Sequence, residues 1–171
     1  MNISANRIIL YGRSIGSGPS SYLAEKYEVA GVILHSPIMS ALRVVFNLRF
    51  TLPFDKFPNI DRMANIDCPI FIIHGRRDEI VPFYHAEELY AKSKIKYPPY
   101  YVDGAGHNNV EKYANDYLPK IRQFISHIDD FIAERMKQEN LNGGAEGEDD
   151  ENLLLPQNTV TANPSNKLIF N

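Results

Sequence analysis

The chain is poor in the features that mark secreted and membrane proteins. Among its 171 residues it has a single cysteine, Cys68, and no tryptophan. One cysteine cannot form an internal disulfide, which excludes a disulfide-stapled domain and favours a reducing compartment. No apolar run approaches the about 18 residues that cross a bilayer, and the first residues lack the basic-then-apolar layout of a signal peptide. We therefore expect a cytoplasmic location.

The distribution of charged residues and of metal-ligating residues argues against a nucleic-acid-binding protein and against a metalloprotein. The formal net charge is −3, and the basic residues are scattered rather than clustered on one element, so no nucleic-acid surface is expected. No His-x-Glu motif or cysteine pair has the spacing of a metal site, and we expect neither a metal nor a cofactor. What the chain does have is 44% hydrophobic residues, which is enough for the core of one globular domain.

The most informative segment joins an apolar strand to a helix. The strand is expected over residues 7–11 and runs into Gly12-Arg13-Ser14-Ile15-Gly16. A serine with a glycine two residues away on either side, between a strand and a helix, is typical of a nucleophile elbow. We expect side chains at Gly12 or Gly16 to collide with neighbouring elements in so sharp a turn. The helix start would direct the Ile15 N–H at an oxyanion, which makes Ile15 the candidate oxyanion-hole residue.

Two phosphate-binding motifs fit this segment less well. A P-loop needs a lysine before Ser or Thr, and none follows Gly16 or Gly18. A dinucleotide fingerprint needs a small residue where Ser21 stands and an acid at the end of the next strand, where the chain has His35. An ordinary strand-to-helix turn that happens to contain a serine stays open on this segment alone.

Two later strands supply candidates for the other members of a catalytic triad. Residues 69–73 are uniformly apolar, as in a parallel strand covered on both faces, and they lead into a loop that carries Asp78. Residues 99–102 are expected to form another strand, which leads into a glycine-rich loop that carries His107. The order serine, acid, histidine on successive loops is typical of one class of serine hydrolases. Ser14 would be the nucleophile, His107 the base, and Asp78 the acid that orients the base.

The other titratable residues near these loops have simpler interpretations. The acid could in principle be the neighbouring Glu79, but Asp78 is better placed because it comes first after the turn. We expect His35 and His74, which follow strands, to be structural hydrogen-bonding residues. We expect His85 and His127, which fall on predicted helices, to be surface or partly buried residues.

The remaining segments complete the organisation. A connection over about residues 37–67 holds many apolar residues interrupted by prolines, and it either shapes an acyl pocket or only packs a cap onto the core. Apolar residues then recur at helical spacing up to residue 137, which predicts an amphipathic helix against the sheet. Residues 138–171 are rich in Asn, Gly and acids, and we expect a disordered tail.

The chain resembles the C-terminal part of an α/β-hydrolase, and more narrowly the ABHD17 (FAM108) group of protein depalmitoylases. The resemblance covers residues 7–128 and rests on the elbow, on Val32-Ile-Leu-His-Ser-Pro-Ile-Met-Ser40, on Ile73-His-Gly75 with Asp78-Glu79, and on Gly104-Ala-Gly-His-Asn108. It implies a partial α/β domain over residues 1–137, with a mostly parallel sheet and helices on both faces. It also implies that Ser14, Asp78 and His107 hydrolyse palmitoyl thioesters on protein cysteines, with an S-acylated protein as substrate.

The chain departs from that group at its start. Only residues 1–6 precede the first expected strand, so the front half of the sheet and the second oxyanion-hole donor that it carries are expected to be missing. Losing one such donor typically costs about a hundredfold to a thousandfold in rate. The first strand would also be an open apolar edge that needs the front half or a partner chain to complete the sheet.

Three functions therefore stay in view. The first is a palmitoyl-protein thioesterase. The second is a catalytically weak or inactive fragment that acts through association with another chain. The third is a hydrolase of another ester or of a peptide, because a triad sets the reaction type but not the leaving group. An acylated membrane anchor, as in the resembled group, is expected only of a full-length form at the cytosolic face of membranes.

Overall fold

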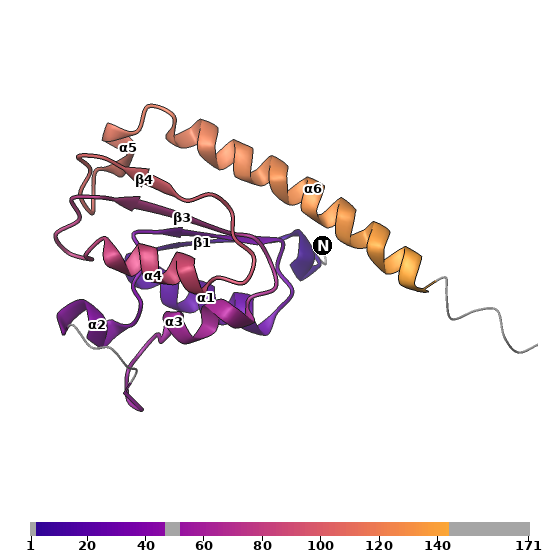
Figure 1. Ribbon diagram of the computed structural model, residues 1–171, viewed down its shortest axis with the longest axis horizontal. Coiled ribbons are helices and arrows are strands. Elements are labelled where there is room, and N and C mark those ends of the chain that lie inside the picture. Colours follow the sequence, from indigo (N-terminus) through magenta and orange to yellow (C-terminus); the bar gives the residue numbers. More distant parts are fainter. Residues whose placement is uncertain (1–2, 47–51, 144–171) are drawn as a thin grey trace, which may run out of the picture. The chain divides into compact units, whose positions relative to one another are not determined.

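The computed structural model describes residues 3–46 and 52–143. At its centre lies a four-stranded sheet in the order β1-β2-β3-β4 (Figure 1). The strands are β1 (Ile9–Arg13), β2 (Gly31–His35), β3 (Ile70–Gly75) and β4 (Tyr100–Val102), and each pairs with the next in parallel. Because the strands are parallel, their carboxyl ends all meet at one edge of the sheet, which is where the candidate site residues follow them.

The apolar runs of the sequence form the two central strands. Every residue of β2 and β3 is buried, as expected of parallel strands covered on both faces. The predicted strand before Ser14 is present but ends two residues later, because Gly12 pairs with Leu34 and Arg13 pairs with His35. The serine therefore follows the last paired residue of β1 directly.

Short helices cover one face of the sheet. They are α1 (Ser17–Lys26), α3 (Asn59–Arg62), the 3-10 turn η3 (Met63–Asn65) and α4 (Tyr84–Lys92), and they lie together below the strands in Figure 1. Their apolar side chains pack on every second residue of the strands. This core includes Ala24, Ile60, Met63, Ala86 and Leu89 against Leu10, Val32, Leu34, Ile70 and Ile72.

One long helix covers the other face. It is α6 (Tyr117–Gly143), and its residues Phe124 and Ile128 are fully or almost fully buried against Ile33, Phe71 and Ile73. The predicted parallel sheet with helices on both faces is thereby confirmed.

Helix α6 also includes residues 138–143, for which the sequence predicts the start of a disordered tail. The chain divides into two units, Met1–Arg135 and Met136–Asn171, and the described part of the second unit, residues 136–143, is helical. Lys, Gln, Glu and Leu are good helix formers, which explains why the helix does not stop at the expected boundary. The tail from residue 144 on lies outside the described residues.

The long connection between β2 and β3 packs onto the first covering helix. It contains α2 (Ala41–Val45), α3 and η3. The Phe57 ring lies against Gly18 of α1, where an added Cβ would come within 2.3 Å of the ring. Leu48 and Phe50, two of the apolar residues of this connection, lie outside the described residues.

β1 is the edge strand of the described sheet, since its only strand partner there is β2. The side chains of Ile8 and Tyr11 beside this edge are exposed. Among the helices of residues 3–46 and 52–143, none combines the length and apolarity that a bilayer crossing requires.

Candidate active site

Ser14 occupies a strained backbone position at the end of β1. Its φ is +51°, a left-handed conformation that non-glycine residues rarely adopt and that costs of order 1–3 kcal/mol. It opens the 3-10 turn η2 (Ser14–Gly16), which leads directly into α1. The first N–H groups of such a turn have no acceptor within it, and the Ile15 N–H is one of them. The strand, turn and helix thus have the geometry of a nucleophile elbow.

The two glycines of the elbow differ, which corrects the expectation that both avoid a collision. A Cβ at Gly12 would lie 2.6 Å from the Gly16 carbonyl oxygen and 2.6 Å from the Ser20 hydroxyl. A Cβ at Gly16 would have no described heavy atom within 4 Å. Gly12 is required because β1 and α1 approach closely there, whereas Gly16 faces open space.

The structure brings Ser14, His107 and Asp78 into one chain of hydrogen bonds. The Ser14 Oγ lies 3.0 Å from His107 Nε2, and His107 Nδ1 lies 2.7 Å from Asp78 Oδ2. An ionised carboxylate only accepts, so Nδ1 carries the ring proton and Nε2 is free to accept from the serine hydroxyl. The three residues are up to 93 positions apart in sequence. Glu79, the alternative acid, lines the nearby cleft instead.

Asp78 is held as a carboxylate by its surroundings. Its Oδ1 accepts hydrogen bonds from the backbone N–H groups of Ile80 and Val81, at 3.0 and 2.8 Å. Its Oδ2 lies 3.3 Å from Nε2 of the fully buried His74. Burial alone would raise the pKa of Asp78, but the hydrogen bonds from His74, Val81 and His107 outweigh it and hold the pKa well below its ordinary value. The carboxylate is therefore charged and able to stabilise a positive charge on His107.

His74 holds the Asp78 carboxylate in place. Its Nε2–H also donates to the Val81 carbonyl oxygen at 2.9 Å, so the ring is fixed by the same short loop that carries Asp78. His74 is a hydrogen-bonding residue, as its position after a strand predicts, but nothing in the sequence indicates that its partners are Asp78 and the Asp78 loop.

Ser17 anchors the elbow to the β2–β3 connection. Its buried hydroxyl donates to the Ser14 carbonyl oxygen at 2.6 Å and accepts from the Ile38 N–H and from Asn59 Nδ2, both at 3.2 Å. This role of Ser17 was not predicted from the sequence. No local pattern marks it, because all its partners except Ser14 are far away in the chain.

The remaining histidines divide into two buried and one exposed. Nδ1 of His35 accepts a hydrogen bond from the Tyr11 hydroxyl, with an oxygen–nitrogen distance of 2.6 Å. Nδ1 of His85 accepts a hydrogen bond from the Met39 backbone N–H, with a nitrogen–nitrogen distance of 3.0 Å. Burial lowers the pKa of each to about 4. The expectation that His85 is a surface or partly buried residue is wrong, because its side chain is fully buried. His127 is exposed.

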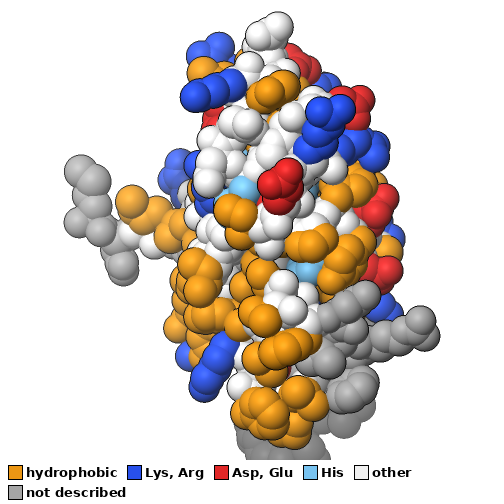
Figure 2. Space-filling view, turned by 90° about the vertical axis from the view of Figure 1, so that its left-hand side faces the viewer, with side chains coloured by type: hydrophobic (Ala, Val, Ile, Leu, Met, Phe, Trp, Pro, Cys, Tyr) orange, Lys and Arg blue, Asp and Glu red, His pale blue; other side chains and the backbone are white. Residues whose placement is uncertain are grey.

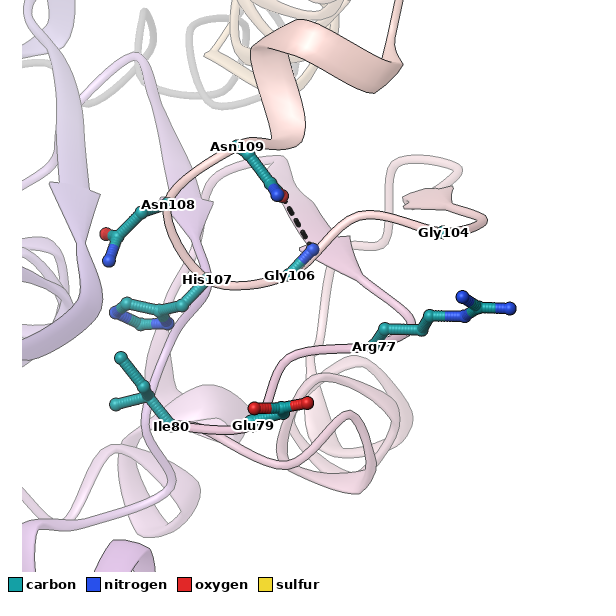
Figure 3. Close-up of a pocket in the computed structure, with 8 residues that line it drawn as sticks. All are labelled: Arg77, Glu79, Ile80, Gly104, Gly106, His107, Asn108 and Asn109. Carbon is teal, nitrogen blue, oxygen red and sulfur yellow. Dashed lines mark hydrogen bonds between the residues drawn. The ribbon is translucent and has the colours of Figure 1, made fainter.

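A cleft of about 350 Å³ lies beside His107, between the loops that follow β3 and β4. Most of its lining is polar, and the His107 ring points away from Gly104 and Arg77 (Figure 3). The cleft therefore borders the histidine loop rather than the space above Ser14. Figure 2 looks onto the edge of the sheet at which the strands end, where apolar side chains gather. Exposed apolar residues on the elements at this edge are Ile15, Val45, Phe46 and Ile80.

Solved structures with a similar fold include a putative lipase and an esterase. A putative lipase from Acinetobacter baumannii matches 72% of this chain and 62% of its own, with a TM-score of 0.57 and 15% sequence identity. An esterase from Pyrococcus furiosus matches 71% of this chain and 54% of its own, with a TM-score of 0.57 and 18% identity. At these identities the likeness shows the fold alone. These likenesses show that the described chain has part of the α/β-hydrolase fold.

Curated relatives show which group of proteins the sequence is similar to. Mouse alpha/beta hydrolase domain-containing protein 17C is 48% identical over 126 residues, and human protein 17B is 46% identical over 125 residues. The alignments cover 73% and 72% of this chain but only 39% and 43% of those relatives. The chain is thus similar to the C-terminal portion of the domain-containing protein 17 group and spans about two fifths of its members' length. No family model matches the chain.

Proposed function

We propose that the chain carries the triad of a serine hydrolase of the palmitoyl-protein thioesterase type. The observation that supports it is the continuous hydrogen-bonded path from the Ser14 hydroxyl through His107 to the Asp78 carboxylate. The strained φ of Ser14 adds to this, because backbone strain of this kind clusters at functional sites.

The proposed reaction has two halves. In the first, Ser14 Oγ attacks the thioester carbonyl carbon and its proton passes to His107 Nε2. The C–S bond then breaks, and the cysteine sulfur leaves with that proton as a thiol. In the second half, a water molecule gives a proton to His107 and attacks the acyl-serine, which releases the fatty acid and restores the Ser14 hydroxyl. The Asp78 carboxylate stabilises the imidazolium in both halves, and the Ile15 N–H donates to the oxyanion.

The choice of a thioester as the substrate rests on the resemblance of the sequence to the depalmitoylase group and on the apolar edge. The proposed site opens on the edge where the side chains of Ile15, Val45, Phe46 and Ile80 are exposed, and each buried methylene of an acyl chain contributes roughly 0.8 kcal/mol. The mostly polar cleft beside His107 is a poor match for such a chain. We propose that the reaction takes place in the cytoplasm, because a single cysteine, Cys68, cannot form an internal disulfide of the kind found in oxidising compartments.

Fluorophosphonate labelling tests the nucleophile. Ser14 should form a bond to phosphorus with loss of fluoride, and labelling should disappear in Ser14→Ala but persist in the control Ser126→Ala, which changes an exposed serine on α6. Equal labelling of wild type and Ser14→Ala would refute the assignment. A palmitoyl-thioester peptide and its oxygen-ester and amide counterparts then identify the substrate class, and faster hydrolysis of either counterpart would favour another ester or a peptide.

The open edge of β1 supports a second candidate function. An unpaired parallel edge strand is a template for pairing with another chain, and β1 has this position among the described strands. On this alternative the chain acts by association, and catalysis is weak or absent. Light scattering at increasing concentration, combined with the labelling assay, separates the two: a folded chain that associates but does not label at Ser14 is a binding fragment.

A further inference from the structure

The side chain of Arg13 links the strand that carries the serine to the loop that carries the histidine. Its Nη2 donates to the His107 carbonyl oxygen at 3.0 Å and to Asn108 Oδ1 at 3.4 Å. Its Nη1 lies 3.5 Å from Glu111 Oε1, on the short helix α5 (Val110–Tyr113) that follows the loop. One guanidinium therefore contacts three consecutive parts of the segment around His107.

The other side of the same loop is attached to the strand that precedes Asp78. The Arg77 N–H donates to the Ala105 carbonyl oxygen at 2.8 Å, and an added Cβ at Gly75 would come within 2.4 Å of that same oxygen. Within the loop, Asn109 Oδ1 accepts the Gly106 N–H at 2.7 Å (Figure 3). These contacts hold residues 105 and 106, whereas the carbonyl group of His107 itself is held by Arg13.

We propose that Arg13 is a positioning residue that fixes the distance between the Ser14 hydroxyl and the His107 imidazole. This inference rests on the proposed function. Arg13 is bonded covalently to Ser14 and hydrogen-bonded to the backbone of His107, so it connects the nucleophile and the base directly, by a route outside the triad itself. Arginine suits this role because its planar group presents several donors in a fixed arrangement, which a lysine cannot reproduce.

The ion pair with Glu111 is not what makes Arg13 important. The side chains of Arg13 and Glu111 are 37% and 40% exposed, and exposed ion pairs contribute little to stability. The consequence of losing Arg13 is geometric, because the His107 carbonyl loses its contact with β1 and the ring can move away from Ser14. A displacement of about 1 Å at a reacting group can cost about a hundredfold in rate.

The test compares Arg13→Met with Arg76→Met. Arg76 also makes an ion pair with this loop, at 3.0 Å to Asp103, but it does not contact His107. Arg13→Met should slow the fluorophosphonate labelling of Ser14 by about tenfold or more, with kcat for an ester substrate falling and KM little changed. Arg13→Lys should fall between wild type and Arg13→Met, and Arg76→Met should label at the wild-type rate.

A second measurement separates this inference from the proposed function. Nitrogen-15 spectra of the His107 ring report its hydrogen bonds whether or not the chain is active, and Arg13→Met should shift these signals while Arg76→Met leaves them in place. Wild-type labelling and unshifted ring signals in Arg13→Met would overturn the positioning role. If wild type and Ser14→Ala label equally, the proposed function fails, and the ring signals alone then decide whether Arg13 positions His107.

Discussion

The unequal surroundings of Gly12 and Gly16 lead to opposite predictions for the same substitution. In Gly12→Ala the new methyl group would lie 2.6 Å from the Gly16 carbonyl oxygen and 2.9 Å from its carbonyl carbon. Both are backbone atoms and cannot rotate away, so β1 and the start of α1 must separate. Forcing a methyl group into such a site costs typically 1–3 kcal/mol, and we expect about 2 kcal/mol lost from the free energy of unfolding.

Gly16→Ala should have the reverse effect. The position has φ of −62° and no described atom within 4 Å of the added Cβ. An alanine is compatible with this backbone, and it lowers the conformational entropy of the unfolded chain, which stabilises by about 0.4–1 kcal/mol. The two variants should therefore differ in unfolding free energy by about 1.4–4 kcal/mol.

Urea denaturation followed by circular dichroism measures this difference, and the labelling rate of Ser14 gives a second readout. Gly12→Ala should unfold at lower urea and label more slowly, because the separation moves Ser14 relative to His107. Gly16→Ala should keep wild-type labelling. Identical midpoints for the two variants, or a less stable Gly16→Ala than Gly12→Ala, would show that the elbow is not held by the steric contact at Gly12.

Two further predictions concern buried polar groups. The pKa of His85 is lowered from 6.5 to about 4 by burial, so the unfolded chain binds a proton between these values that the folded chain does not. The contribution of His85 to the free energy of unfolding is therefore full above pH 6.5 and is lost as the pH falls toward 4. His85→Gln should reduce the slope of the unfolding free energy against pH in this window by the equivalent of about one proton. An unchanged slope would contradict the buried neutral state of His85. Ser17→Ala removes the partner of the Ser14 carbonyl, the Ile38 N–H and the Asn59 amide, and should cost about 2–3 kcal/mol in thermal or urea unfolding, while the exposed control Ser126→Ala should unfold like wild type.

The sheet could be predicted because its signals are local. A short apolar run bounded by turn residues is typical of a buried parallel strand, and residues 70–73 of the predicted strand over 69–73 fall within β3, whose residues are all buried. The elbow could be located for the same reason, since serine, glycines and flanking elements are contiguous. The end of β1 was displaced by two residues because strand pairing with Leu34 and His35, which the sequence does not show, extends it.

The features that were missed depend on contacts between distant segments. Ser17 contacts residues 38 and 59, and Arg13 contacts residues 107 and 108, so neither has a signature within its own segment. His85 was misassigned although one signal was present: it lies four residues before the buried Leu89 on α4, and therefore on the same helix face. A histidine that shares a helix face with buried apolar residues, as His85 does on α4, is better predicted to lie in the core.

The strand order has a consequence for how the chain is made. Because β1-β2-β3-β4 follows the order of synthesis, a ribosome releasing about 5–20 residues per second lets each strand join the previous one as it emerges. The surface formed by Ile33, Phe71 and Ile73 then stays partly uncovered until Phe124 and Ile128 of α6 are translated. Nascent chains halted before that helix should be bound by chaperones that recognise apolar surface, and chains that include it should be released.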